Sequence, residues 1–345
     1  MEKITINTTG FRSEILVGAN WEKVSSLLPE KGAVIITDDN VRKLYGSRFP
    51  KVPVFSLLPG EGSKKLEVIE NLAEKLLEAG IDRTGFVLAV GGGVVCDVAG
   101  FLASIYMRGI SCGYVSSTLL SQVDASTGGK NGVNLRGTKN MIGTVRQPEF
   151  VICDPVLLLT LPEQEYLSGL AELIKTATIG DKELFELIER SFEEIISRKS
   201  GLLTQLVAKS VTFKGFVVSK DEKETGLRRI LNFGHTFGHV VEMQKAVKHG
   251  FAVASGMELA TAFSYEKGYI TLEDKDRISN LLKKFKLIKK LDLTDDQIEK
   301  HILHDKKKTG TDIHFVFTGG IGKARVEKVS ISDLIDFYKR YRDKK

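Results

Sequence analysis

The sequence predicts an α/β N-terminal domain of Rossmann-like type, followed by a mainly α-helical C-terminal domain. Short β-rich runs alternate with helical periods over residues 1–158, the rhythm of βαβ units around a parallel sheet. Long amphipathic segments dominate residues 159–345. A chain of 345 residues exceeds what one hydrophobic core usually serves. We therefore expect two closely packed domains with a cleft between them.

The elements follow from apolar periodicity and turn residues, in chain order. Strands are predicted over residues 32–39, 52–57, 86–93 and 112–117, with helices over 66–80 and 94–109. Beyond the apolar segment 154–162, helices are predicted over 181–198, 200–220 and the histidine-rich region, with a hairpin over 314–326. The basic tail, residues 338–345, is expected to be a solvated run of charge.

Composition narrows the class of protein. Fifty lysines and arginines against 44 aspartates and glutamates give a net charge of +6, without the long basic block of a nucleic-acid-binding protein. Cys96, Cys112 and Cys153 are widely spaced, which argues against a disulfide framework and a thiolate metal site. The N-terminus lacks a signal pattern, and no apolar stretch approaches ~18 residues. We expect a soluble cytoplasmic protein without a membrane partner.

A glycine run, Gly91–Gly93, follows one predicted strand and opens a helix. Backbone N–H groups and the helix dipole can hold a phosphate there, and a dinucleotide pyrophosphate is the natural ligand. Cys96 stands where the usual GxGxxG motif has its third glycine, so a generic glycine turn stays open as an alternative. Asp38 and Asn40 end an earlier strand, where ribose hydroxyls are usually bound.

A second unusual stretch, residues 117–143, is glycine-rich, aperiodic and too polar to be core. Its candidate functional side chains are Asp124, Lys130, Lys139 and Asn140. Such loops tend to bind ligands. The two lysines and the asparagine, converging with Arg108, would form an anion pocket with charge-assisted hydrogen bonds to phosphate. A solvated loop with scattered lysines is the alternative interpretation.

Three of the six histidines lie in one helix-forming stretch: His235, His239 and His249. His235 and His239 are four apart, so both side chains leave the same helix face. His249 follows a short break, where a second helix could bring it back. With a carboxylate ligand this cluster suits a divalent metal, although an i,i+4 histidine pair is also found as two polar residues of a helix surface.

Glu172, in the segment GLAELIK, is the carboxylate that we expect to complete this metal site. Lys175 lies three residues further on and faces the same way on a helix. Taken alone, the two residues would be a surface ion pair.

Together these motifs resemble the 3-dehydroquinate synthases of the sugar phosphate cyclase group. The resemblance is collinear from about residue 34 to 320 and rests on GGGVVCDVAGFLASIYMRG, STLLSQVDASTGGKNGVN, KNMIG, GLAELIK, DEKETGLRRILNFGHTFGH and KHG. It implies a dehydroquinate synthase-like fold and an NAD- and metal-dependent lyase of the shikimate pathway. Such an enzyme converts 3-deoxy-D-arabino-heptulosonate 7-phosphate to 3-dehydroquinate and phosphate, reducing and reoxidising NAD within one turnover.

The resemblance also implies the residues that hold the metal and the substrate. Glu172, His235 and His249 would hold the metal, zinc or cobalt, and His239 would face the substrate instead. The implied catalytic residues are Lys130, Lys175, Glu224 and His239. The implied substrate-binding residues are Arg108, Lys130, Asn140, Lys175, Lys214, Arg228, Asn232, His239 and Lys306, the last adjoined by Lys307 and Lys308. Arg108 would complete the phosphate pocket of a neighbouring subunit, which implies a homodimer.

Around NAD the resemblance implies Asp38, Asn40, Glu61, Lys64, Gly92, Gly93, Val94, Asp97, Thr118, Asp124 and Lys139. The sequence departs from the family pattern in three places: His249-Gly250-Phe251 replaces HGE, Ser116-Ser117-Thr118 replaces PTT, and Cys96 replaces a glycine. If the family's glutamate supports the metal ligands, its absence lowers the affinity of this protein for the metal. The variant Phe251→Glu would then bind metal more tightly than wild type.

Two rival functions use a similar set of residues. A sibling cyclase would act on another sugar phosphate and would be separated from the family above by its substrate. A metal-dependent NAD polyol dehydrogenase of related fold predicts net accumulation of NADH. The candidate anion site argues against this second function, because a neutral polyol would leave its polar and charged groups without a partner. The residues of that site are Lys130, Lys139, Asn140 and Arg228.

Overall fold

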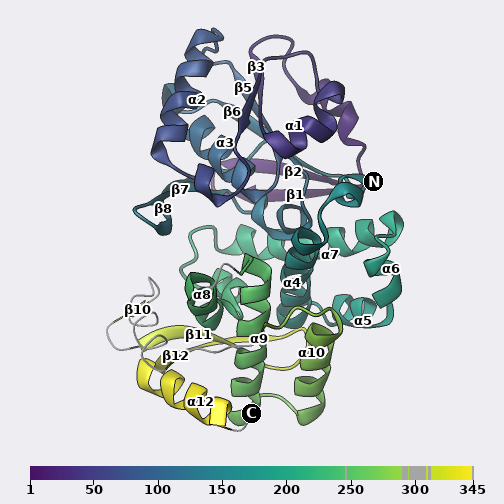
Figure 1. Cartoon of the computed structure of the whole chain (residues 1–345), viewed down its shortest axis with the longest axis vertical. Coiled ribbons are helices and arrows are strands. Elements are labelled where there is room, and N and C mark those ends of the chain that lie inside the picture. Colours follow the sequence, from purple (N-terminus) through teal and green to yellow (C-terminus); the bar gives the residue numbers. More distant parts are fainter. Residues whose placement is uncertain (245–246, 290–293, 295–307, 310–311, 344–345) are drawn as a thin grey trace. The chain divides into compact units, whose positions relative to one another are not determined.

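The computed structural model describes residues 1–244, 247–289, 294, 308–309 and 312–343, which group into two compact units (Figure 1). The first consists of Met1–Leu161 and Arg198–Lys223, and the second of Pro162–Ser197 and Glu224–Lys345. The sequence predicts a single boundary at 158/159 and assigns the segment 198–223 to the helical domain. In the structure this segment groups with the first unit, because its helix packs on the N-terminal hairpin.

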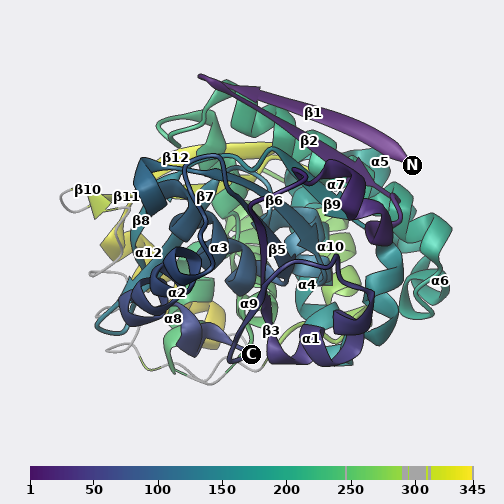
Figure 2. The same ribbon diagram turned by 90° about the horizontal axis from the view of Figure 1, so that it is seen from above.

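The first unit is built on a seven-stranded sheet with the order β1-β2-β9-β6-β5-β3-β4. The outermost pair, β1 and β2, is antiparallel (Figure 2), and the other neighbours are parallel, which confirms the predicted parallel sheet. The strands are β1 (Glu2–Thr8), β2 (Phe11–Val17), β3 (Ala33–Asp38), β4 (Val54–Leu57), β5 (Phe86–Gly91), β6 (Ser111–Ser116) and β9 (Phe150–Cys153).

The inner strands differ in composition from the hairpin at the edge. All of β5 is buried, and its continuous apolar run is typical of a strand that is covered on both faces. The N-terminal hairpin is absent from the elements predicted above. In β2 the buried residues Ser13, Ile15 and Val17 alternate with more exposed ones, the period of a strand covered on one face.

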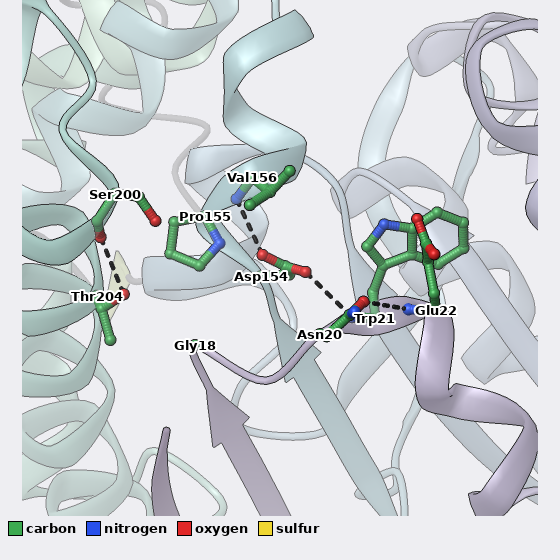
Figure 3. Close-up of a pocket in the computed structure, with 9 residues that line it drawn as sticks. All are labelled: Gly18, Asn20, Trp21, Glu22, Asp154, Pro155, Val156, Ser200 and Thr204. Atoms are coloured by element: carbon green, nitrogen blue, oxygen red, sulfur yellow. Dashed lines mark hydrogen bonds between the residues drawn. The ribbon is translucent and has the colours of Figure 1, made fainter.

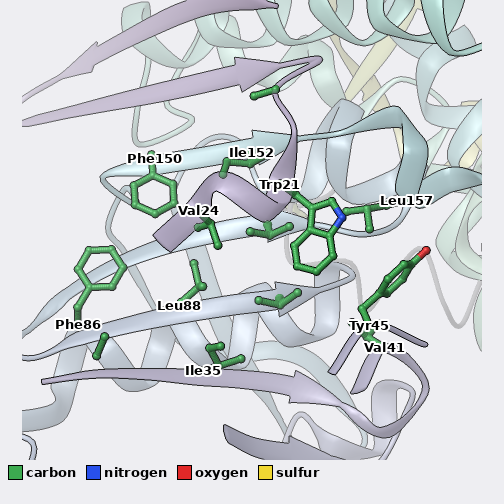
Figure 4. Close-up of a cluster of buried hydrophobic side chains, with 14 residues drawn as sticks. Trp21, Val24, Ile35, Val41, Tyr45, Phe86, Leu88, Phe150, Ile152 and Leu157 are labelled. Carbon is green, nitrogen blue, oxygen red and sulfur yellow. The ribbon is translucent and has the colours of Figure 1, made fainter. Parts of the chain in front are cut away.

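The helices of the first unit are α1 (Asp39–Tyr45), α2 (Leu66–Glu78), α3 (Gly93–Ile105) and α7 (Ser200–Lys220). A cluster of buried side chains fills one side of the sheet (Figure 4). Within it Trp21 meets Tyr45 edge-on at 5.6 Å between ring centroids, and Phe86 stacks on Phe150 at 5.8 Å. Full burial of a side chain such as Phe86 stabilises the fold by ~1.5–3 kcal/mol.

The polar segment 117–143 is more ordered than the aperiodic loop that we predicted. Residues Ser121–Ala125 form a π-helical turn, followed by the hairpin of β7 (Lys130–Leu135) and β8 (Thr138–Val145). The hairpin closes through Arg136 and Gly137, with φ of 45° and 81°. Positive φ at both central residues is the geometry of a two-residue hairpin turn, which glycine favours at its second position. The loop interpretation was wrong because this turn signal was overlooked.

The second unit is mainly helical, as predicted. Its helices are α4 (Glu163–Gly180), α5 (Lys182–Arg190), α6 (Phe192–Ile196), α8 (His235–Gln244), α9 (His249–Glu266), α10 (Leu272–Lys284) and α12 (Ile331–Asp343), beside a small antiparallel sheet of β10 (Lys308–Thr309), β11 (Asp312–Thr318) and β12 (Ala324–Ser330). The pair β11 and β12 confirms the late hairpin. Among the described helices, none is both long and apolar enough to cross a membrane.

The basic tail is not simply a solvated run of charge. Its first residues belong to α12, where Phe337 and Tyr338 are buried. Phe263 of α9 stacks on Phe337 with 4.3 Å between ring centroids, while Arg340 on the exposed side pairs with Glu266. Aromatic residues at helical spacing therefore anchor this segment, and the basic residues between them face outward.

Candidate active site

Helix α4 carries Glu172 and Lys175 into the interior of the second unit. Every residue from Tyr166 to Ile179 is buried, so this part of the helix is enclosed on all sides. The Lys175 ammonium lies 2.5 Å from Glu172 Oε2, and the two side chains are 2% and 0% exposed. The surface ion-pair interpretation is therefore wrong. A buried pair of this kind carries a large desolvation cost and indicates a site more than a source of stability.

His235 and His249 begin α8 and α9 and converge on Glu172. The Nε2 atoms lie 3.7 Å and 3.3 Å from Glu172 Oε1. One ligand atom from each of the three residues lies within 4.8 Å of the others, and within the described parts of the chain this is the group that could hold a metal ion. His239 is not a member of this group, although its ring lies 5.6 Å from that of His235. The pair suggested by i,i+4 spacing is thus not the metal-capable set.

Glycines bring the three helices close enough for this convergence. A Cβ on Gly250, the second residue of α9, would lie 2.0 Å from the Ser168 carbonyl oxygen of α4. Gly250 N–H also donates to Ser168 Oγ at 3.0 Å. Between α8 and α9, a Cβ on Gly256 would lie 1.9 Å from the Gly234 carbonyl oxygen. Only glycine permits such approaches, so these glycines determine where the helices that begin with His235 and His249 are placed.

The charges of the cluster suit a cation. Burial acts to raise the pKa of Glu172, but Lys175 and the two imidazoles overcome it and hold that pKa well below its usual range. Burial, reinforced by Lys175, places the pKa of His235 well below its usual range despite Glu172. The group therefore offers an ionised carboxylate and a neutral imidazole, the forms that bind metals.

His249 differs from His235. Burial acts to lower its pKa, but hydrogen bonds to Glu172 and Glu242 raise it to about 10. A proton held between two carboxylates marks a position that favours positive charge, where a divalent cation could replace it. Both oxygens of Glu172 are buried and face cations, Oε2 at 2.5 Å from the Lys175 ammonium and Oε1 at 3.3 Å from His249 Nε2. A buried carboxylate surrounded by positive charge fits a metal ligand.

The second unit also holds part of the expected substrate side. Arg228 is 3% exposed and lies in the short 3-10 turn Leu227–Asn232. Asn232 Nδ2 donates to Glu224 Oε1, so these two predicted residues are brought together. Glu224 has a left-handed backbone, with φ of 60°. Lys306 and Lys307 lie outside the described residues.

In the first unit, the buried Lys64 contacts three other predicted residues. Lys64 is 3% exposed, and its ammonium donates to Asp97 Oδ2 at 2.6 Å and Asn140 Oδ1 at 2.5 Å. Glu61 Oε1 lies 3.8 Å from the same ammonium. Burial raises the pKa of Asp97 to about 6, against the lowering effect of Lys64. Asn140, expected beside substrate, here contacts residues assigned to the cofactor.

The carboxyl ends of the parallel strands place further predicted residues at one edge of the sheet. Asp38 ends β3, and its carboxylate accepts from Val41 N–H at 3.0 Å, capping α1, which carries the exposed Asn40. β5 leads through Gly92 into Gly93 and Val94 of α3, as predicted. A Cβ on Gly92 would lie 2.9 Å from Thr118 Cγ2.

The remaining predicted cations lie in the same unit. Lys214 of α7 is 6% exposed and contacts Asp124 twice, at 2.9 Å to Oδ1 and 2.6 Å to the carbonyl oxygen. Lys130 begins β7 and Lys139 lies in β8, both exposed. Arg108, also exposed, has φ of 71°. The predicted convergence of Arg108, Lys130, Lys139 and Asn140 into one anion pocket stays a prediction, as does an interdomain cleft.

Two residues of these clusters were missed in the sequence. Asn134 accepts from Asn140 N–H at 2.9 Å and donates to Glu61 Oε1 at 2.9 Å, while its own N–H donates to the Lys64 carbonyl. Nothing in its spacing singles it out. Glu242 Oε1 lies 3.4 Å from His249 Nδ1. Its position seven residues after His235, on the same face of a helix, was a usable signal.

One further pocket, of about 290 Å³, lies in the first unit (Figure 3). It is lined by Gly18, Asn20, Trp21, Glu22, Asp154, Pro155, Val156, Ser200 and Thr204, none of them a predicted site residue. Asp154 is its buried charge, and both carboxylate oxygens accept backbone N–H groups, from Trp21 at 3.1 Å and Val156 at 3.0 Å. With its acceptors satisfied, this carboxylate has a structural role.

Comparison with known proteins connects these clusters to one family. Family models described as 3-dehydroquinate synthase N-terminal and C-terminal match residues 54–168 and 169–308. A 3-dehydroquinate synthase from Solibacter usitatus is 42% identical over 311 residues, covering 87% of each chain.

Solved structures give the same picture of the fold. A 2-deoxy-scyllo-inosose synthase complexed with carbaglucose-6-phosphate, NAD+ and Co2+ is 26% identical with a TM-score of 0.88, covering 98% of this chain and 100% of that one. A 2-epi-5-epi-valiolone synthase from Streptomyces hygroscopicus with NAD+ and Zn2+ bound is also 26% identical, with a TM-score of 0.89 over 98% of this chain and 99% of that one. The resemblance seen in the sequence is confirmed: the chain belongs to the 3-dehydroquinate synthase family of enzymes.

Proposed function

We propose that this enzyme converts 3-deoxy-D-arabino-heptulosonate 7-phosphate to 3-dehydroquinate and inorganic phosphate, with NAD and a divalent metal as cofactors. Membership of the family supports a lyase that eliminates phosphate. The observation that carries the cofactor proposal is the convergence of Glu172, His235 and His249. This chemistry needs a Lewis acid, and a metal ion bound by these three side chains would supply it. Glu172 is ionised and His235 is neutral, while the proton on His249 could be exchanged for the metal.

Glu172, His235 and His249 would hold the metal, zinc or cobalt. When bound, it would polarise the substrate hydroxyls beside the carbon that exchanges hydride with NAD. The buried Lys175, in contact with Glu172, keeps that carboxylate ionised and would reach the substrate from the same helix face. His239 lies one helical turn from His235, so it would contact the substrate rather than the metal.

Further residues would bind and orient the substrate. Arg228 and Lys214, both largely buried, and Lys130 and Arg108, both exposed, would bind its anionic groups by charge-assisted hydrogen bonds. Lys306 is proposed to join them, and Asn140 and Asn232 would donate amide hydrogen bonds. Glu224, held by Asn232, would accept a proton. Fixing one conformer of a flexible heptulosonate is the main contribution of such a set.

The NAD site is proposed at the carboxyl edge of the sheet. Gly92, Gly93 and Val94 would receive the pyrophosphate at the start of α3, and Asp38 and Asn40 the ribose hydroxyls. Beside them would lie Glu61, Lys64, Asp97, Thr118, Asp124 and Lys139. The similar cyclase structures with NAD+ and Co2+ or Zn2+ bound support this pairing of cofactors. In this scheme residues 1–158 form the NAD-binding domain and 159–345 the metal- and substrate-binding domain, apart from the segment 198–223, which groups with the first unit.

We also propose a cytoplasmic homodimer, in which Arg108 completes the phosphate pocket of the neighbouring subunit. The exposed side chain of Arg108 and two successive left-handed residues, Met107 and Arg108 with φ of 47° and 71°, support this role. Backbone strain of this kind costs about 1–3 kcal/mol per residue and is concentrated at functional sites.

One assay tests the proposed reaction. Purified enzyme receives the heptulosonate phosphate, NAD and Zn2+ or Co2+, while phosphate, cyclic product and absorbance of NADH are followed. We expect stoichiometric phosphate, no lasting NADH signal and loss of turnover on adding a chelator. Net NADH accumulation would indicate a polyol dehydrogenase, and turnover confined to another sugar phosphate would indicate a sibling cyclase.

A further inference from the structure

The two imidazoles of the metal-capable group are held in matching ways at their outer nitrogens. His235 Nδ1 lies 3.2 Å from the Phe233 carbonyl oxygen. His249 Nδ1 lies 3.4 Å from Glu242 Oε1. Both Nε2 atoms face Glu172 Oε1, at 3.7 Å and 3.3 Å. Each ring is thus anchored at one nitrogen and presents the other to the shared ligand position.

We propose that Glu242 is the positioning residue of this metal site: its carboxylate accepts the Nδ1–H of His249 and directs Nε2 toward the position shared with Glu172 and His235. The inference rests on the proposed metal site and deepens it. A carboxylate behind a ligating imidazole fixes the tautomer and raises the basicity of the ligand nitrogen. The backbone carbonyl behind His235 fixes its ring in the same tautomer but carries no charge.

The packing of α8 on α9 makes this contact a property of the fold. Glu242 lies two turns after His235 on α8, and its side chain is 11% exposed. A Cβ on Gly238 would lie 3.1 Å from the Ala252 carbonyl oxygen, so the helix backbones are nearly in contact one turn before Glu242. This close approach places a carboxylate of α8 beside the first residue of α9.

The other charged groups near His249 have different partners. Lys248, its neighbour in sequence, pairs with Glu165, and both side chains are more than two-fifths exposed, at 44% and 43%. Phe251, where the family pattern has glutamate, is 2% exposed, with the Lys289 ammonium 4.5 Å from its ring centroid. The sequence suggested that Phe251 leaves the metal without a supporting carboxylate. Glu242 supplies one from the neighbouring helix.

The test compares Zn2+ affinity of wild type, Glu242→Gln, Glu242→Ala and Glu165→Gln, by competition with a chromogenic chelator. Loss of an outer carboxylate typically weakens metal binding by about 10–100-fold. We expect a loss of this size in Glu242→Ala, a smaller one in Glu242→Gln, which keeps a neutral acceptor, and less than about 2-fold in Glu165→Gln. That control also replaces a carboxylate by an amide, but at a residue that pairs with Lys248 and not with His249. Equal affinity of Glu242→Ala and wild type, or an equal loss in the control, would overturn the proposal.

A second measurement needs no change at Glu242. In Zn2+-loaded wild type labelled with 15N-histidine, we expect His249 to show a protonated Nδ1 and a metal-shifted Nε2. Metal on Nδ1, or no metal shift at either nitrogen, would overturn the proposal. Failure of the proposed metal site is recognised separately, because His235→Ala would then bind Zn2+ as tightly as wild type.

Discussion

Gly250 and Ser168 define how closely α9 approaches α4. The glycine N–H donates to Ser168 Oγ at 3.0 Å, and any Cβ on residue 250 would meet the Ser168 carbonyl at 2.0 Å. One residue before Gly250 stands His249, and one turn after Ser168 stands Glu172. A contact between backbones therefore determines a distance between two proposed ligands.

Gly250→Ala is expected to push the start of α9 away from α4. Overpacking at a buried site typically costs about 1–3 kcal/mol, and here it would also separate His249 from Glu172. Denaturant unfolding and Zn2+ titration should both show a loss. Gly201→Ala is the matched control, because no atom lies within 4 Å of its added Cβ. That variant should be neutral or slightly more stable, and a harmless Gly250→Ala would contradict the close-approach argument.

His235→Ala and His239→Ala should separate metal binding from chemistry. The first removes a proposed ligand, so affinity should fall by more than the ~10–100-fold that outer partners contribute. The second should retain metal and lose about 10²–10⁴-fold in kcat, the usual contribution of a proton-transferring side chain. Metal content by atomic absorption and kcat from phosphate release are the two measurements. Loss of metal in His239→Ala would restore the i,i+4 interpretation.

Asp97 should make stability depend on pH in the cofactor-free enzyme. Its pKa is raised in the folded state from 3.8 to about 6, chiefly by burial, so the folded protein binds this proton more tightly than the unfolded chain. The stabilisation of the fold by protonated Asp97 is therefore fully present below pH 3.8 and is lost as the pH rises through about 6. Urea unfolding from pH 4 to 7 should show this slope.

Lys64→Met provides the counterpart experiment for the same carboxyl group. The ammonium lowers the pKa of Asp97, so its removal should move the carboxyl titration above the wild-type midpoint. 13C resonances of labelled aspartate would follow the shift. An unchanged or lower midpoint would show that Lys64 does not hold this proton equilibrium.

Asn134→Ala should weaken the cluster around Lys64. The change leaves Glu61 Oε1 and the N–H of Asn140 without their present partner, and an ordinary hydrogen bond contributes about 0.5–1.5 kcal/mol. We expect lower stability and weaker NAD binding, measured by thermal unfolding and fluorescence titration. Asn7→Ala, on the exposed side of β1, should stay within ±0.5 kcal/mol. Unchanged NAD affinity would separate Asn134 from the cofactor site.

Local pattern alone predicted much of the fold. The apolar run of β5, the glycines that open α3 and the period of α2 each depend on residues close in sequence, and the structure has them as expected. The hairpin of β1 and β2 was missed because charged and polar residues stand among its apolar ones, and an edge strand is defined largely by its partner. The placement of α7 depends likewise on what it packs against.

By itself the sequence determined which chemical groups were available and on which helix face each would stand. It identified Glu172, His235 and His249, and through its motifs the family. Only the tertiary structure decided that Glu172 and Lys175 are buried, that the two histidines converge on that carboxylate from two helices, and that Glu242 stands behind His249. Helical spacing fixes neighbours within one helix, whereas convergence of three helices depends on backbone packing at glycines, which no local period records.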